Sequence, residues 1–245
     1  MKNTVLQNYL TGDLLKTMSK GVIYYTDNKL GEPIFTTVQK YILASGLPIT
    51  SCSLEPMNFG TNVVYKGSPS FMTYMTQIEF ALANSKEDYV FFCEHDVLYP
   101  KSHFEFTPPK DNIFYYNENV YRWLYGSDFA ITYDRLISLS GLCVNREFAL
   151  EHYRKRIDRA VTMPPENNIR EPSWARAWGY EPGTKKPKNG GFSELAYETW
   201  KSSESLVDIR HTGTISKAKV SLSDFKHPPT NWKQISVSEI PGWNL

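Results

Sequence analysis

The chain has 245 residues and a formal net charge of +1 at pH 7, with 27 Lys and Arg against 26 Asp and Glu. This length is enough for one large domain with a sizeable core. The balanced charge excludes a whole-chain electrostatic attraction to nucleic acid or to acidic partners. Aromatic residues make up 14% of the chain, which suits the stacking of sugars and bases but serves ordinary cores equally well.

The cysteines and the amino terminus bear on where the protein is located. Cys52, Cys93 and Cys143 are odd in number and form no CxxC pair, which favours a reducing compartment over a disulfide framework or a zinc knuckle. The first residues contain no long apolar segment of the signal-peptide type, and no stretch approaches about eighteen apolar residues. The sequence therefore predicts a soluble, cytoplasmic protein with no membrane span.

The first hundred residues alternate between strand and helix patterns. Strands are predicted at 21–26 and 47–54, and helices at 33–44 and from residue 68 onward, with Ser68 as the N-cap of the second helix. An unbroken apolar run at 90–93 predicts a strand that is buried on both faces. This alternation is typical of an α/β fold with a mostly parallel central sheet and helices on both faces.

The buried strand at 90–93 ends in Glu94, His95 and Asp96. In an extended chain, residues two apart point the same way, so both carboxylates are expected on one side of the strand's carboxyl end, with His95 on the other. Ligands of open α/β sheets bind at that end. Paired carboxylate oxygens suit Mg²⁺ or Mn²⁺, which in turn holds a diphosphate. The competing interpretation is a strand that simply ends in solvent.

The second half of the chain has a less regular pattern. It predicts strands at 112–117, 139–144 and 206–210, an aromatic segment at 121–125, and helices at 146–159 and 192–201. Residues 163–191 hold five of the fifteen prolines and little periodicity, which is typical of a functional or disordered loop.

Several of these segments, in this order, resemble GT-A glycosyltransferases of the family-2-like type. Phe91-Phe-Cys-Glu-His-Asp-Val-Leu-Tyr99 resembles the Asp-x-Asp segment of that fold, with Glu94 in the first acidic place. Ser140-Gly-Leu-Cys-Val-Asn-Arg146 and Gly190-Gly-Phe-Ser-Glu194 are similar to the acceptor-side segments. Together with Phe-Tyr-Tyr-Asn and Asp-Ile-Arg-His, they resemble small bacterial and phage enzymes over most of residues 20–225.

The resemblance implies one GT-A (Rossmann-like) domain over 1–245, with a nucleotide-sugar half at 1–100 and an acceptor half with a carboxyl-terminal tail at 101–245. It implies metal-dependent transfer of a sugar from a nucleoside diphosphate sugar, a UDP-sugar being favoured, to an acceptor hydroxyl with inversion. The acceptor would be a glycan or a hydroxymethylated DNA base, in a bacterium or a phage-infected host cell.

The resemblance also implies roles for residues of the donor half. Asp96 would bind Mn²⁺ or Mg²⁺ directly, and Glu94 would reach the metal through water or bind the ribose. Thr26 and Asp27 would meet the base and ribose of the donor, although Asp27 is equally well explained as a turn former. The ion would neutralise the leaving diphosphate.

His211 is expected to complete the metal site. It follows the strand at 206–210, and it would emerge at the same sheet edge as Asp96 if that strand is parallel. Asp208 or a backbone carbonyl would then hold its other ring nitrogen. The alternative is an ordinary hydrogen-bonding His in a turn with Gly213 and Thr214.

The acceptor side offers aromatic, acidic and basic candidates. The acceptor-binding rings would be Tyr116, Trp123 and Tyr125, although ordinary packing explains each ring as well. Glu194 would be the catalytic base, with Glu171, Glu181 and Glu204 as competitors. The basic residues that would suit a DNA acceptor are Arg154, Lys155, Arg156, Arg159, Lys185, Lys186 and Lys188.

Three other functions fit parts of the pattern. A nucleotidyltransferase would share the fold and the acidic pair, but it usually carries a Gly-rich phosphate loop, and Asp27-Asn-Lys-Leu-Gly31 has one glycine. A non-catalytic carbohydrate- or DNA-binding module would need no metal-binding pair at a strand end. A nuclease would use Glu94 and Asp96 but lacks a lysine nearby on the same strand.

Overall fold

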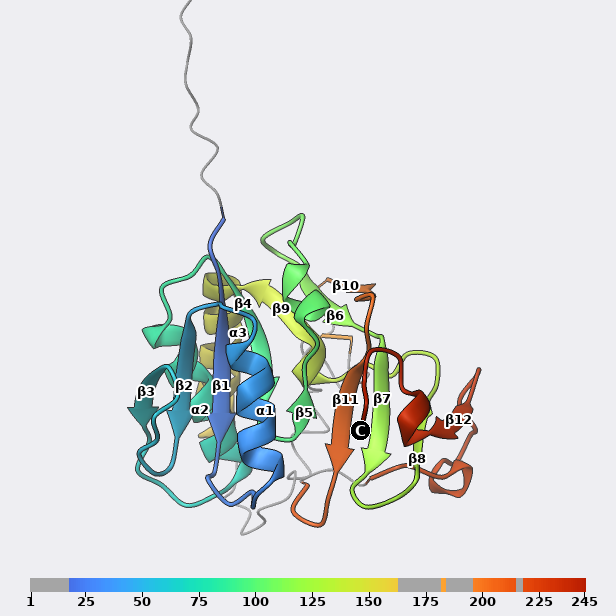
Figure 1. Ribbon diagram of the computed structural model, residues 1–245. Coiled ribbons are helices and arrows are strands. Elements are labelled where there is room, and N and C mark those ends of the chain that lie inside the picture. The colour runs from blue at the N-terminus through green and yellow to red at the C-terminus, as the bar shows by residue number, and fades with distance from the viewer. Residues whose placement is uncertain (1–17, 163–181, 184–195, 215–217) are drawn as a thin grey trace, which may run out of the picture.

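The fold of the protein, taken from a computed structural model that describes residues 18–162, 182–183, 196–214 and 218–245, contains two sheets and three α-helices within those residues (Figure 1). The strands are β1 (Lys20–Thr26), β2 (Ile49–Ser53), β3 (Thr61–Val64), β4 (Tyr89–Glu94), β5 (Val97–Leu98), β6 (Phe114–Asn117), β7 (Val120–Leu124), β8 (Phe129–Thr132), β9 (Leu142–Asn145), β10 (Tyr197–Trp200), β11 (Leu206–Arg210) and β12 (Lys233–Ser236). The α-helices are α1 (Ile34–Leu43), α2 (Phe71–Asn84) and α3 (Arg146–Ala160).

The central sheet has the strand order β10-β6-β9-β4-β1-β2-β3 among the described residues. β1 pairs in parallel with β2 and β4, β2 pairs in parallel with β3, and β10 pairs in parallel with β6. Only β9 runs against its neighbours β4 and β6. The predicted α/β class with a mostly parallel central sheet is therefore confirmed.

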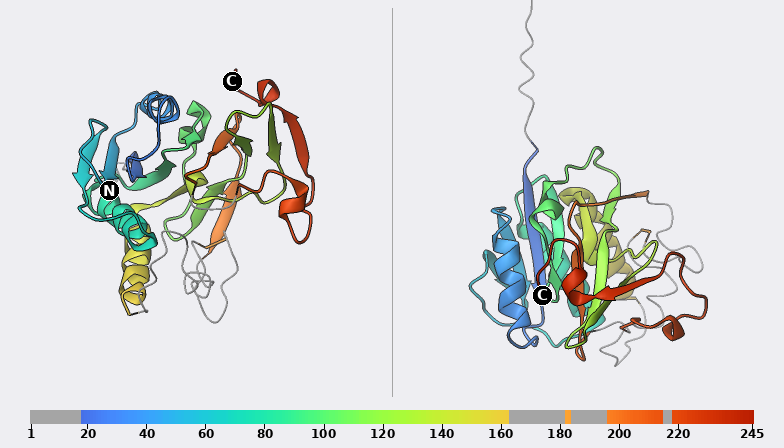
Figure 2. Two further views of the ribbon diagram at one scale, coloured as in Figure 1. Left: turned by 90° about the horizontal axis from the view of Figure 1, so that it is seen from below. Right: turned by 45° about the vertical axis from the view of Figure 1, so that its right-hand side comes forward.

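Helices cover both faces of the central sheet, as predicted (Figure 2). On one face α1 packs through Ile34, Val38 and Ile42 into a core that also contains residues of the second sheet. On the other face α2 and α3 pack against the inner strands. In the described part of the chain, no helix is long and apolar enough to cross a membrane.

The start of α2 lies two residues later than the sequence predicts. Ser70, not Ser68, is the N-cap, and its Oγ accepts a hydrogen bond from the Thr73 backbone N–H at 3.0 Å. Ser68 contributes its backbone carbonyl instead, which accepts from Thr73 Oγ1. Pro69 therefore precedes the helix, and its ring is compatible with the extended chain before a cap.

The second half of the chain departs more from expectation. β11 and β7 belong to a second sheet of order β12-β8-β7-β11-β5 in the described residues, which the sequence patterns do not predict. The predicted helix at 192–201 is wrong where the structure describes it, because Tyr197–Trp200 form β10. β10 pairs in parallel with β6, so a sheet contact distant in sequence overrides the local helical pattern.

A buried histidine packs against the ends of β6 and β10 in the central sheet. His103 is fully buried, and its ring stacks on Trp200 with centroids 5.4 Å apart. Its Nδ1 is 3.2 Å from the amide nitrogen of Asn117, so the ring is a neutral acceptor there. Burial lowers the pKa of His103 to about 3.

This burial predicts that the protein loses stability in mild acid. An unfolded His has a pKa of about 6.5, so below that pH the unfolded chain binds one proton that native His103 does not. The free energy of unfolding should therefore fall by about 1.4 kcal/mol per pH unit between about 6.5 and 3. In His103→Gln this component disappears, so urea unfolding at several pH values should show a shallower acid decline. Parallel declines in the two proteins would contradict this prediction.

Candidate metal centre

The chain turns sharply where β4 ends. β4 ends at Glu94, His95 and Asp96 form a turn, and β5 starts at Val97. β11 runs antiparallel to β5, and the Ile209 backbone N–H donates to the Asp96 carbonyl at 2.8 Å. The residue that follows β11, His211, is thereby brought beside Asp96.

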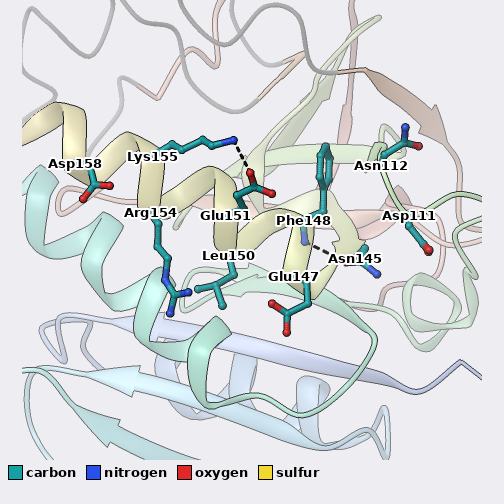
Figure 3. Close-up of a pocket in the computed structure, with 10 residues that line it drawn as sticks. All are labelled: Asp111, Asn112, Asn145, Glu147, Phe148, Leu150, Glu151, Arg154, Lys155 and Asp158. Carbon is teal, nitrogen blue, oxygen red and sulfur yellow. Dashed lines mark hydrogen bonds and ion pairs between the residues drawn. The ribbon is translucent and has the colours of Figure 1, made fainter.

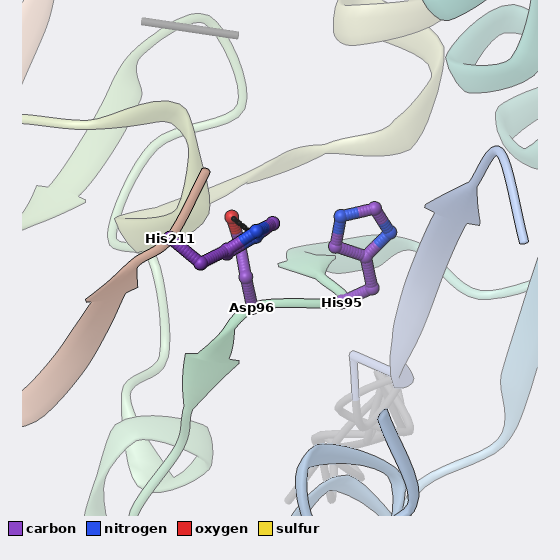
Figure 4. Close-up of side chains that lie close together, drawn as sticks. All are labelled: His95, Asp96 and His211. Carbon is purple, nitrogen blue, oxygen red and sulfur yellow. Dashed lines mark ion pairs between the residues drawn. The ribbon is translucent and has the colours of Figure 1, made fainter. Parts of the chain in front are cut away.

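Three side chains meet at this point (Figure 4). His95, Asp96 and His211 each offer one ligand atom, and these atoms lie within 4.8 Å of one another. His211 Nε2 is 3.4 Å from Asp96 Oδ2, and the two side chains are only 14% and 11% exposed. Asp96 and His211 lie next to each other, as predicted. The reason differs from the predicted one, because β11 pairs antiparallel with β5 and is not a parallel strand of the central sheet.

Glu94 and Asp96 do not lie on one face of an extended strand, contrary to expectation. The alternation of side chains stops at Glu94 because the next two residues turn. Glu94 Oε1 accepts a hydrogen bond from the Tyr25 hydroxyl at 3.0 Å, whereas Asp96 faces His211. Burial, and next the charge of Asp96, raise the pKa of Glu94 to about 8.

Asp96 remains ionised although it is buried. Burial alone would raise its pKa, but the contact with His211 and the charge of Arg210 are among the effects that outweigh it. The pKa of Asp96 is therefore held below its ordinary value. A buried carboxylate among imidazoles is the electrostatic environment that a cation ligand requires.

His95 was expected on the far side of the strand, and the turn corrects this. Its Nδ1 lies 2.7 Å from Thr26 Oγ1, at the end of the neighbouring strand β1. Thr26 is 3% exposed, and its Oγ1 also accepts from the Asn28 backbone N–H. The hydroxyl of Thr26, predicted to contact the donor, is thus directed at His95. Asp27 is half-buried and accepts from the Lys29 backbone N–H, as a turn former does.

The second ring nitrogen of His211 was expected to be held by Asp208 or by a backbone carbonyl, but neither holds it in the part of the chain that the structure describes. Its Nδ1 accepts a hydrogen bond from the Gly213 backbone N–H at 3.1 Å. A neutral ring with an acceptor at Nδ1 carries its proton on Nε2. Asp208 is engaged elsewhere, by the side chains of Arg122 and Arg210.

These residues fit a divalent cation. His211 Nε2 is buried and makes no hydrogen bond to any residue that the structure describes. Its nearest charge is the Asp96 carboxylate, so an ion between them would satisfy both groups once the ring proton is on Nδ1. Two imidazoles and one carboxylate are a common ligand set for first-row divalent metals.

Behind this cluster lies a buried ionic group that the sequence patterns did not reveal. Asp208 is bound by Arg122 Nε at 3.0 Å and by Arg210 Nη1 at 3.1 Å. Arg122 Nη1 also donates to the Tyr133 hydroxyl. Because Arg210 immediately precedes His211, this group fixes the end of β11 at the candidate metal centre.

The predicted acceptor rings lie in different surroundings. Tyr116 is fully buried in the core on the α2 and α3 side, so its ring offers no surface for stacking, and its expected role is corrected. Trp123 is half-buried and Tyr125 is 46% exposed, with ring centroids 5.5 Å apart. The Tyr125 backbone N–H donates to the Arg210 carbonyl at 2.9 Å, so the backbone at Tyr125 lies beside the residue that precedes His211.

The candidate bases are only partly described. Glu194, Glu171 and Glu181 lie outside the described residues. Glu204 precedes β11, at the opposite end of that strand from His211. No carboxylate among the described competitors is therefore placed at the metal centre as a base.

A hollow of about 470 Å³ lies elsewhere, beside α3 (Figure 3). Asn145, on its wall, pairs with Tyr89 at the start of β4, so the hollow is at the opposite strand end from the metal centre. Its two cations already have acidic partners, since Arg154 binds Glu79 and Lys155 binds Glu151. Among the described residues that line it, the hollow therefore has no cation left for an anionic donor.

Comparison with known proteins gives little beyond this geometry. No protein-family model matches the chain, and no curated protein matches it. Among solved structures, the apo form of the glycosyltransferase GlyE from Streptococcus pneumoniae is similar over 60% of this chain and 39% of its own, with 15% identity and a TM-score of 0.38. The chain thus spans less than half the length of that protein. A likeness of this extent identifies no family, so a function has to be argued from the side chains at the strand ends.

Proposed function

We propose that the chain is a metal-dependent glycosyltransferase, which moves a sugar from a nucleoside diphosphate sugar to an acceptor hydroxyl. The observation that carries this proposal is the cluster of His95, Asp96 and His211 where β4 and β11 end. Two of its members, His95 and Asp96, lie in the segment that resembles the Asp-x-Asp motif, and the cluster faces the edge at which α/β sheets bind their ligands.

Asp96 and His211 would hold Mn²⁺ or Mg²⁺, and their 3.4 Å contact supports a shared ligand position. When bound, the ion would neutralise the charge that develops on the leaving diphosphate. Glu94 is not part of the cluster and is hydrogen-bonded to Tyr25. It would bind the donor ribose or a water molecule on the metal. The role of Asp96 is thus to stay ionised beside the phosphates.

The donor nucleoside would lie over the end of β1. β1 is the parallel neighbour of β4, so Thr26 and Asp27 adjoin the acidic turn. Thr26 is occupied with His95 and Asn28, which leaves Asp27 as the better candidate for contact with the base or ribose. A UDP-sugar remains the favoured donor.

The acceptor would lie on the other side of the metal centre, over Trp123 and Tyr125. The Trp123 indole N–H donates to the Ser127 carbonyl at 2.9 Å, which fixes its ring, and Tyr125 is exposed beside it. A fixed aromatic surface suits a sugar ring. A glycan acceptor is favoured over hydroxymethylated DNA, because Arg154 and Lys155 are already ion-paired. Glu194 remains our candidate base for an inverting transfer.

Thermal denaturation with Mn²⁺ and UDP tests this proposal against its rivals. A glycosyltransferase should melt at a higher temperature with both present than with either alone, because the ion and the diphosphate bind together. Protection by nucleoside triphosphates but not by diphosphates would favour a nucleotidyltransferase. No response to any nucleotide with metal would favour a non-catalytic binding module and would contradict the proposal.

A further inference from the structure

His95 is placed in the metal cluster by the turn that ends β4. If the strand had continued through Asp96, the His95 ring would have pointed to the opposite face. Instead His95, Asp96 and His211 have ligand atoms within 4.8 Å of one another. An ion bonded at about 2.1 Å to each ligand holds no two of these atoms more than about 4.2 Å apart, so the three side chains have to move closer together when the ion binds.

The contact with Thr26 prepares the His95 ring for this role. Thr26 Oγ1 is 2.7 Å from His95 Nδ1 and can accept a hydrogen bond from the ring when Nδ1 carries the proton. The lone pair is then on Nε2, the nitrogen not engaged by Thr26. Metal-binding histidines commonly donate their other ring N–H to an oxygen acceptor in this way, which fixes both the tautomer and the ring orientation.

We propose that His95 is a direct ligand of the metal and that Thr26 is its positioning residue, so that the centre contains two imidazoles and one carboxylate. This inference deepens the proposed function by naming the ligands of the same site. Metal binding itself does not depend on which reaction the site performs. The sequence pattern placed His95 on the opposite side of the strand from the two carboxylates, and it placed Thr26 in donor binding.

The two histidines differ in whether their hydrogen bonds favour the tautomer that binds a metal through Nε2. His211 Nδ1 accepts from the Gly213 N–H at 3.1 Å, so its proton is on Nε2, the nitrogen that faces Asp96. To bind a metal through Nε2, His211 must move that proton to Nδ1, where the Gly213 N–H then opposes it. Binding through His211 therefore requires the loss of its hydrogen bond from Gly213, whereas binding through His95 can keep the contact with Thr26.

The ligand set determines which ions the centre prefers. Imidazole nitrogen is a poor ligand for Mg²⁺, which favours oxygen and retains several waters, whereas Mn²⁺ and Co²⁺ accept nitrogen ligands. We therefore expect the protein, without any nucleotide, to bind Mn²⁺ at least about tenfold more tightly than Mg²⁺.

The test is a titration of the full chain with metal alone. Electron paramagnetic resonance of free Mn²⁺ gives the affinity, and the visible spectrum of added Co²⁺ reports its ligands. His95→Ala should weaken Mn²⁺ binding by about 10- to 100-fold and change the Co²⁺ spectrum. Thr26→Val should weaken it by about tenfold, and Thr26→Ser, which keeps the hydroxyl, should restore it. Melting curves without metal show whether each variant is folded.

The outcomes separate this inference from the proposed function. Wild-type Mn²⁺ affinity and an unchanged Co²⁺ spectrum in folded His95→Ala would show that His95 is not a ligand. Equal losses in Thr26→Val and Thr26→Ser would refute positioning by the hydroxyl. A chain that binds Mn²⁺ through His95 but turns over no nucleoside diphosphate sugar would contradict the proposed function and leave this inference standing.

Discussion

Replacement of Asp96 by Asn is expected to reduce kcat/KM for sugar transfer by at least about 100-fold. Asp96 is the carboxylate of the candidate metal centre, 3.4 Å from His211 Nε2, and its pKa is held low so that it remains charged. An amide of the same shape removes the charge that holds the cation. Initial rates at saturating Mn²⁺, followed by release of the nucleoside diphosphate, measure this effect.

The fold should survive this substitution, because Asn occupies the same volume and the Asp96 backbone carbonyl still accepts from Ile209. The matched control is Asp27→Asn, at the end of the neighbouring strand, which should retain metal binding and lose at most part of the donor affinity. Wild-type turnover in folded Asp96→Asn with metal present would exclude Asp96 as the metal ligand.

The largest effect on stability is expected from Asp208→Asn. Asp208 is 4% exposed and binds both Arg122 and Arg210. Loss of its charge leaves two guanidinium groups without this carboxylate in the protein interior, and breaking a buried ion pair from one side costs about 3–5 kcal/mol. Equilibrium unfolding in urea at neutral pH should show a loss of this size.

An exposed pair provides the control for this measurement. Glu151 and Lys155 form an ion pair one helical turn apart on α3, with side chains 64% and 62% exposed. Glu151→Gln should cost no more than about 0.5 kcal/mol, because solvent screens the interaction. Similar losses in the two variants would mean that Asp208 contributes no more than an ordinary surface charge.

Most of the first half of the fold could be predicted because its signals are local, although the edge strand β3 was not predicted. Apolar runs, Pro33 and Gly46 mark the strands and the first helix within two or three residues, and the alternation of strand and helix indicates parallel pairing. The strand that ends at Glu94 was located for the same reason. These patterns reflect burial of one continuous stretch of chain, so neighbouring residues contain the information.

The second half of the fold and the candidate metal centre depend on contacts between residues that are distant in sequence. β11 pairs with β5 and β7 in a second sheet, and Tyr197–Trp200 become a strand by pairing with β6. No local pattern reports these partners. The turn formed by His95 and Asp96 has the largest effect on the candidate metal centre. It brings His95 into the cluster and places Glu94 and Asp96 on different sides. The buried group around Asp208 could not be predicted because it depends on Arg122, which lies 86 residues away from Asp208 in the chain.

A screen of nucleoside diphosphate sugars tests the central claim most directly. The full chain is incubated with each donor and Mn²⁺, and release of the nucleoside diphosphate is measured with and without a chelator, beside Asp96→Asn. We expect release from at least one donor, a UDP-sugar first of all, that is abolished by the chelator and by the substitution. Absence of release and of sugar transfer from every donor, in protein shown to bind Mn²⁺, would contradict glycosyl transfer as the function of this chain.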